Sequence, residues 1–170
     1  MPGVLLPRGG VPVTPPVWFG SRDLAWMAGE AARMAPLETG GVLVGYGGPR
    51  DGYLVTAVVG PGPDAVHERH RFVPDAAFHT REVARLYRES GRTEVYLGDW
   101  HSHPDGEAYL SSTDRRTLRA VAQSEEARSP CPIMVVLGGR TGAVRAWHLT
   151  PHRARWRLRP VPCAVRTLRS

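Results

Sequence analysis

This sequence of 170 residues contains no lysine, so its 22 permanently charged basic residues are all arginine. Such complete use of arginine is typical of the coding bias of a GC-rich genome. Only two cysteines occur, Cys131 and Cys163, and they lie far apart and outside any C-x-x-C pair. This excludes a disulfide framework and a thiolate zinc site, so both are expected to be small buried side chains.

Long apolar runs are missing as well. Hydrophobic residues make up 42% of the sequence and charged residues 22%, and no run approaches the roughly 20 residues that cross a bilayer. The apolar residues 4–6 are interrupted by Pro7 and Gly9, so they lack the apolar region of a secretory signal. We expect one globular domain in the cytoplasm, with no membrane partner and no predicted oligomeric state.

Acidic residues are missing from the last twenty positions. Residues 151–170 hold six arginines and no acid, whereas residues 1–150 hold 16 arginines and 16 acids, so this segment carries the whole net charge of +6. A basic segment can bind nucleic acid. However, Trp156 is its only aromatic residue, and aromatics for base stacking are lacking. A solvated edge strand is the simpler interpretation, and nucleic acid is not an expected partner.

The periodicity of apolar residues predicts a mixed α/β domain. Helical spacing occupies residues 21–35, 74–91 and 113–127. Strand-like runs occupy residues 17–20, 38–46, 53–60, 71–73, 94–101, 133–137, 144–149 and 154–158. Turn signals between the runs predict hairpins. The expected fold is a mainly antiparallel sheet flanked by helices.

The segment from Gly98 to Asp114 concentrates residues that can bind a metal, and reads GDWHSHPDGEAYLSSTD. His101 and His103 are two apart on an expected strand, so their imidazoles project from one face. Pro104 ends the strand, and a loop of about ten residues can return the next helix over the histidines. Two histidines and a carboxylate are a common catalytic zinc set.

Three acids compete to be the third ligand. Asp105 lies so close to His103 that it would need a tight local turn, and Glu107 lies in the middle of the loop. Asp114 is favoured because the start of a helix is a more rigid mount. The spacing Ser111-x-x-Asp114 also fits a capping box, in which the two side chains satisfy amides of the first helical turn. The structural explanation therefore stays open beside the metal-binding one.

Glu38 begins the strand signal ETGGVLVGY, 63 residues before His101. The glycines of this run predict that another backbone comes close. A carboxylate held rigidly there can serve as a general base although it is distant in sequence. Taken alone, Glu38 is an ordinary residue at a helix-to-strand junction. A serine hydrolase is disfavoured because no G-x-S-x-G motif occurs.

These residues resemble the JAMM family of zinc isopeptidases and related hydrolases, also called MPN-plus. The family pattern is a glutamate, then H-x-H, then ten residues and an aspartate, with a serine three positions before the aspartate. The matching residues here are Glu38, His101, His103, Ser111 and Asp114. The contexts ETGGVLVG and GDWHSHP are similar to the family's as well.

The resemblance spans roughly residues 20–150 and implies a β-barrel-like α/β core related to the cytidine deaminase fold (JAB/MPN). It implies that Zn²⁺ is held by His101, His103 and Asp114. Glu38 would take the proton of the zinc-bound water, and Ser111 would stabilise the oxyanion. Together with the composition of the two ends, the resemblance gives the expected domains: an extended segment at 1–16, the JAB/MPN metalloprotease domain at 17–160 and a basic tail at 161–170.

Within the family, the sequence is similar to stand-alone bacterial domains encoded near ubiquitin-like conjugation machinery, including CBASS antiphage operons. The likeness lies in GPGP and HERHRFVPD, between Gly60 and Asp75, and in ARLYRESG before the histidines. It implies cleavage of an amide or isopeptide bond after the C-terminus of a ubiquitin-like protein or a CD-NTase. No long insertion is present to bind ubiquitin, so loops 61–70 and 104–110 are expected to border the cleft.

Two further functions stay open. The metal site is compatible with an amide hydrolase that acts on a small sulfur-carrier protein or a small molecule. A non-catalytic scaffold is the other alternative, as in family members that lack the ligands. Every ligand position is intact in this sequence, which favours an enzyme.

Overall fold

The computed structural model describes residues 14–152 and 157–168 of the chain. Most of the expected segment 1–16 and the first part of the expected strand 154–158 therefore lie outside the described residues. The elements follow one another as β1 (Pro16–Gly20), α1 (Ser21–Met34), β2 (Gly40–Gly48), β3 (Gly52–Val59), β4 (Val66–Glu68), β5 (Arg71–Val73), α2 (Ala76–Glu89), β6 (Val95–His103), α3 (Ser112–Gln123), β7 (Ile133–Gly138), β8 (Val144–His152) and β9 (Arg157–Leu168).

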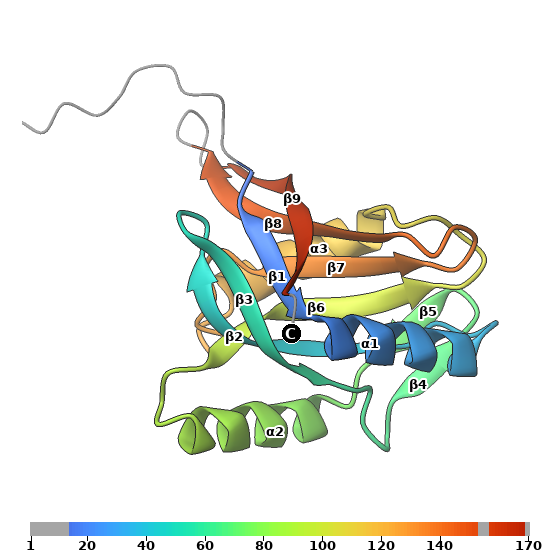
Figure 1. Cartoon of the computed structure of the whole chain (residues 1–170), viewed down its shortest axis with the longest axis horizontal. Coiled ribbons are helices and arrows are strands. Elements are labelled where there is room, and N and C mark those ends of the chain that lie inside the picture. The colour runs from blue at the N-terminus through green and yellow to red at the C-terminus, as the bar shows by residue number, and fades with distance from the viewer. Residues whose placement is uncertain (1–13, 153–156, 169–170) are drawn as a thin grey trace, which may run out of the picture.

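Seven strands close into a barrel in the order β1-β3-β2-β6-β7-β8-β9, and β9 pairs with β1 to complete it (Figure 1). Four of the seven neighbouring pairs are antiparallel, and β1–β3, β1–β9 and β6–β7 are parallel. The separate strands β4 and β5 form a two-stranded hairpin. The expected mixed α/β class with a barrel-like, mainly antiparallel sheet is confirmed.

The main apolar cluster fills the barrel. Val17 and Phe19 alternate inward from β1, and Trp100 of β6 joins them, all at most 1% exposed. Helix α1 adds the fully buried Met27 to this cluster. Two smaller clusters lie between the sheet and the other helices, with α2 over β2 and β6 and α3 over β7 and β8 (Figure 1). Burial of these side chains is the main stabilising contribution to the barrel.

Strand β9 replaces the basic tail expected at residues 161–170. It pairs with β8 from residue 157 and with β1 as far as Leu168, so the boundary expected at residue 160 falls inside a barrel strand. Cys163 and Val165 pack against the barrel core, whereas Arg166 is exposed. This alternation is the strand period of two. The prolines and arginines of β9 made this alternation hard to recognise in the sequence.

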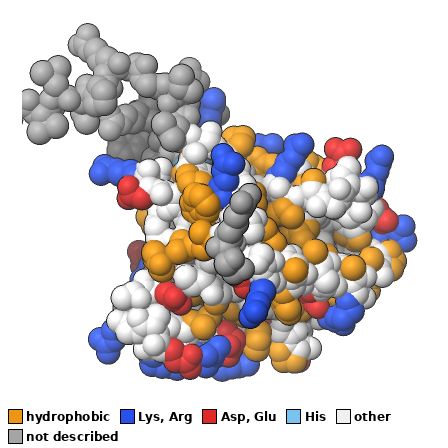
Figure 2. Space-filling view, in the orientation of Figure 1, with side chains coloured by type: hydrophobic (Ala, Val, Ile, Leu, Met, Phe, Trp, Pro, Cys, Tyr) orange, Lys and Arg blue, Asp and Glu red, His pale blue; other side chains and the backbone are white. Residues whose placement is uncertain are grey.

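Charges of both signs are mixed on one face of the molecule. On the face that Figure 2 shows, arginine and acidic side chains are interspersed around apolar ones, so this face carries no large patch of one sign. Among the helices of the described ranges, none has the length and apolar content of a membrane span. The expected lack of a nucleic-acid partner and the expected cytoplasmic location stay predictions.

Candidate metal centre

Strand β6 carries both histidines on one face, as the spacing predicts. The strand continues through His103, two residues further than expected, and the two Nε2 atoms lie 3.0 Å apart. Gly98 permits the preceding bend, because its φ is +153° and a Cβ there would lie 1.9 Å from the carbonyl oxygen of Ile133. Strand β6 therefore reaches the site only with glycine at this position.

Helix α3 brings Asp114 to the histidines through its first turn. Asp114 Oδ1 lies 3.3 Å from His101 Nε2, and Oδ2 lies 3.8 Å from His103 Nε2. The capping box is also formed, because the Ser111 amide donates to Asp114 Oδ2 at 2.7 Å and the Asp114 amide donates to Ser111 Oγ at 3.1 Å. The two explanations of the Ser-x-x-Asp spacing hold together, since the cap fixes the carboxylate beside the imidazoles.

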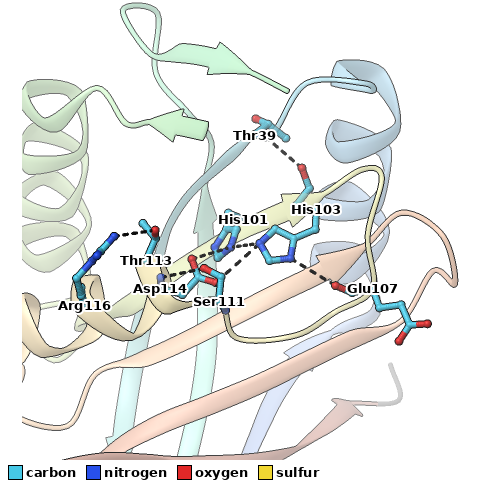
Figure 3. Close-up of polar contacts among 9 residues, drawn as sticks. Thr39, His101, His103, Glu107, Ser111, Thr113, Asp114 and Arg116 are labelled. Atoms are coloured by element: carbon cyan, nitrogen blue, oxygen red, sulfur yellow. Dashed lines mark hydrogen bonds and ion pairs between the residues drawn. The ribbon is translucent and has the colours of Figure 1, made fainter. Parts of the chain in front are cut away.

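The competing carboxylates do not belong to the donor group. Asp105 forms an ion pair with Arg69, at 2.8 Å between Oδ2 and Nε. The Glu107 side chain points away from the histidines (Figure 3), and its backbone oxygen lies 3.4 Å from His103 Nδ1. That contact orients the imidazole with Nε2 toward the site. Within the described residues, the donor group is His101, His103 and Asp114, with its atoms within 4.8 Å of one another.

The protonation states suit metal binding. Burial lowers the pKa of His103, and the neighbouring His101 lowers it further, so the imidazole is held in its neutral, ligating form. Burial alone would raise the pKa of Asp114, but hydrogen bonds and charge from His101 and the contacts with Ser111 bring it down to about 2. The site thus presents a neutral His103 imidazole and an ionised Asp114 carboxylate.

Glu38 lies beside the histidine strand because of two hydrogen bonds between Ser102 of β6 and Thr39, the residue just before β2. The Thr39 amide donates to Ser102 Oγ at 3.1 Å, and the Ser102 amide donates to the Thr39 oxygen at 2.8 Å. Gly40 is then paired with His101 in the sheet. These contacts span 63 residues of sequence. They bring Glu38 to the edge of the metal-binding group.

Glu38 and the three donor residues line one cleft of about 660 Å³, together with Ser111. Burial raises the pKa of Glu38, the charge of His101 opposes this shift, and the charge of Asp114 adds to it. A carboxylate with a raised pKa is a better proton acceptor and donor near neutral pH. The structure therefore places a potential base in the same cleft as a metal-binding triad.

The walls of the cleft come from the two segments expected to border it. Arg69 and His70 lie at the turn of the β4–β5 hairpin, and Asp105 and Tyr109 lie in the loop after β6. The ring of Tyr109 packs on His103 with a centroid distance of 5.0 Å and is exposed on its outer side. The expectation for the loops at 61–70 and 104–110 is confirmed.

Residues 22–150 match the family of prokaryotic homologs of the JAB domain. The chain belongs to this family. The probable metalloprotease y4qB of Sinorhizobium fredii is 39% identical to it over 124 residues, which cover 72% of this chain and 76% of that protein. The resemblance to JAMM-like metalloproteases is confirmed.

Other relatives of this JAB domain are named CD-NTase/cGAS isopeptidases. The protein of Vibrio cholerae is 33% identical over 90 residues, covering 52% of this chain and 56% of that protein. The protein of Enterobacter hormaechei is 26% identical over 127 residues, covering 71% and 66%. A solution structure of a Desulfitobacterium hafniense protein matches with a TM-score of 0.64 at 17% identity, over 91% of this chain and 94% of that one, which shows the shared fold.

Three features of the JAB domain site were not predicted from the sequence. Ser102, between the two histidines, forms two hydrogen bonds with Thr39. Strand β4 was missed, although it contacts the backbone of Glu38. Asp99 lines the cleft and accepts a hydrogen bond from the Tyr96 hydroxyl at 2.8 Å. The alternation D-x-H-x-H was the available signal for Asp99, since period two puts it on the histidine face.

Proposed function

We propose that this JAB domain is a zinc-dependent isopeptidase or peptidase. Its substrate would be the amide or isopeptide bond formed by the C-terminal carboxylate of a CD-NTase or a ubiquitin-like protein. The observation that carries the proposal is one cleft that contains both Glu38 and the donor group His101, His103 and Asp114. The names of the metalloprotease and isopeptidase relatives support it.

The donor group fits zinc. Tetrahedral zinc with bonds of roughly 2.0–2.1 Å places two nitrogen ligands roughly 3.3 Å apart. The two Nε2 atoms lie 3.0 Å apart, and the nearest carboxylate oxygen lies 3.3 Å from His101 Nε2. Two imidazoles with one carboxylate leave a coordination position for water, as catalytic zinc sites require.

The chain's residues divide the hydrolysis between them. When bound, zinc supplies a Lewis acid that polarises the carbonyl and makes water a nucleophile near neutral pH. Glu38 accepts the proton that the attacking water loses and returns it to the leaving nitrogen. Water thereby adds across the C–N bond, which breaks to give a carboxylic acid and an amine. The acid then passes its proton to the amine, so that a carboxylate and an ammonium group leave. The carboxylate of Glu38 ends the cycle unprotonated, as it began.

Ser111 has a hydroxyl proton available for the reaction. Its oxygen accepts the Asp114 amide as the helix cap, and the hydroxyl keeps its own proton as a donor. Ser111 lines the cleft, so we propose that its hydroxyl donates a hydrogen bond to the substrate carbonyl oxygen, on which negative charge develops. A donor mounted on a helix cap is held in place before the reaction begins, which lowers its reorganisation cost.

The test is cleavage of defined fusions by the zinc-loaded protein. One substrate is a CD-NTase joined through its C-terminus to a fluorescent protein, and a second is a ubiquitin-like protein joined in the same way. The proposal predicts cleavage directly after the natural C-terminus of one of them, read by mass spectrometry. Addition of 1,10-phenanthroline should abolish the cleavage, and added zinc should restore it.

A third substrate separates the alternatives. A small sulfur-carrier protein that bears one added C-terminal amino acid tests the carrier-processing function. Cleavage of this substrate alone would replace the proposed substrate class while keeping the zinc mechanism. No cleavage of any of the three by folded, zinc-loaded protein would contradict the proposal and favour the scaffold.

A further inference from the structure

The backbone amide and carbonyl of Glu38 form hydrogen bonds with the β4–β5 hairpin. Glu38 lies two residues before β2 begins, so the barrel ladder does not pair it. Its amide donates to the Glu68 carbonyl oxygen at 2.8 Å, and its own carbonyl oxygen lies 2.9 Å from His67 Nδ1. Both partners belong to β4. Strand β4 therefore holds the Glu38 peptide from both sides.

We propose that His67 is a positioning residue that fixes Glu38 for proton transfer in the cleft. This inference rests on the proposed hydrolase function, in which Glu38 is the base. Glu38 lines the cleft, whereas His67 is not among the described residues that line it. His67 thus acts through Glu38, whose carbonyl oxygen it contacts. Its contact is specific, because a carbonyl oxygen requires a donor, so Nδ1 must carry the proton.

The imidazole of His67 is fixed in its turn by aromatic packing. Its ring centroid lies 5.4 Å from that of Phe72, its direct partner across the hairpin. The Phe72 ring lies over Gly40, where an added Cβ would be 2.9 Å from Phe72 Cε1. Glycine at position 40 therefore lets the hairpin lie against β2 next to Glu38. The hydrogen bond from His67 is directed by this packing.

The turn of the hairpin also reaches the loop that follows the histidines. Arg69 bridges it to Asp105 at 2.8 Å, and both side chains are substantially exposed. An exposed pair of this kind contributes little stability by itself. It links the hairpin to the loop whose Glu107 oxygen orients His103. The hairpin thus contacts both halves of the site, and His67 makes the contact with the base.

Loss of the His67 donor should impair catalysis more than folding. Mutation of a residue that orients a catalytic group typically lowers activity by roughly 10- to 100-fold. A small displacement of a reacting group has an effect of similar size. We expect His67→Phe, which keeps a ring beside Phe72 but removes the donor, to lower kcat by roughly 10- to 100-fold. KM, zinc content and thermal stability should stay near the wild-type values.

Two matched variants complete the experiment. His67→Asn places an amide donor near the position of Nδ1 and should keep most of the wild-type kcat. Val66→Ala changes the neighbouring residue of β4, whose side chain is 48% exposed, and should leave kcat unchanged. Each variant is assayed as the full chain, loaded with zinc, on whichever fusion substrate the wild type cleaves. A wild-type kcat in His67→Phe would overturn the inference.

A measurement without turnover tests the same contact. Nitrogen-15 NMR of the imidazole in the metal-free chain should show His67 with its proton on Nδ1. A proton held on Nε2 alone would contradict the hydrogen bond to Glu38. If the zinc-loaded wild type cleaves no substrate, the proposed function fails while this tautomer still tests the contact. A parallel loss of zinc content in His67→Phe would assign His67 to the packing of the hairpin and also overturn the inference.

Discussion

Ser111 and Asp114 each serve two purposes at the residue scale. Their side chains cap α3 reciprocally, and the same hydrogen bonds hold the Asp114 carboxylate beside the histidines. A metal ligand must be ionised and rigid, and the cap contributes to both. The cost of a mutation here therefore combines helix stability with the chemistry of the cleft.

Substitutions at Ser111 separate its capping of α3 from its proposed role as an oxyanion donor. Ser111→Ala should lower the free energy of unfolding by about 1 kcal/mol, as for other lost N-caps, and lower kcat by roughly 10²- to 10³-fold through loss of an oxyanion donor. Ser111→Thr keeps the hydroxyl and should retain much of both. Urea unfolding and cleavage kinetics provide the two measurements. A destabilised Ser111→Ala protein with the wild-type kcat would restrict Ser111 to capping.

Gly40 offers a second test at this scale. A Cβ at this position would lie 2.4 Å from the carbonyl oxygen of Trp100 and 2.9 Å from His101 Cβ. Gly40→Ala should therefore displace β6 or the hairpin, with a loss of about 1–3 kcal/mol in the free energy of unfolding, and should weaken zinc binding. Gly48→Ala on the same strand is the control, because nothing lies within 4 Å of its added Cβ. Equal stability of the two variants would contradict the close packing at Gly40.

The two histidines and Asp114 were predictable from local rules. Period two puts His101 and His103 on one face, and a helix start is a rigid mount for Asp114. The strand context made Glu38 a candidate base, but taken alone it was an ordinary residue at a helix-to-strand junction, and only the family resemblance favoured the catalytic role. Its position depends on the exchange between Thr39 and Ser102, 63 residues apart. A contact of that range is set by strand pairing and leaves no local signal.

At the scale of elements, the β4–β5 hairpin shows where pattern reading stops, because β5 was predicted at residues 71–73 whereas its partner β4 was missed. Each has three residues, and β4 alternates exposed and half-buried positions. So short a polar segment has no detectable periodicity, and only tertiary contacts stabilise it. The longer strands β2, β6 and β7 are rich in buried residues and were predicted near their true positions.

Strand β9 gives the prediction for this scale. A chain that ends at residue 156 lacks the strand between β8 and β1, which opens the barrel and exposes two edges. We expect it to lose the cooperative unfolding transition in urea, followed by circular dichroism. A chain that ends at residue 168 keeps all of β9 and should unfold like the full-length protein. Cooperative unfolding of the shorter chain with an unchanged midpoint would show that residues 157–170 are a dispensable tail.

At the scale of the whole molecule, the barrel brings distant segments together at one edge. Strands β2 and β6 are neighbours although α2 and the β4–β5 hairpin lie between them in sequence. Their pairing joins Glu38 to the histidine strand, and α3 returns Asp114 from the other side. The sequence predicted the class of fold, but the parallel pairing of β1 with β3 and β9 depends on closure of the whole sheet.

The central claim is that one metal ion and Glu38 act together in the cleft. It is tested most directly by elemental analysis and cleavage kinetics of the wild type and of Glu38→Gln, each purified without chelators. Both proteins should hold stoichiometric zinc, and Glu38→Gln should be slower by roughly 10²- to 10⁴-fold because only the base is lost. A Glu38→Gln protein that cleaves at the wild-type rate, or a wild-type protein active without any metal, would contradict the claim.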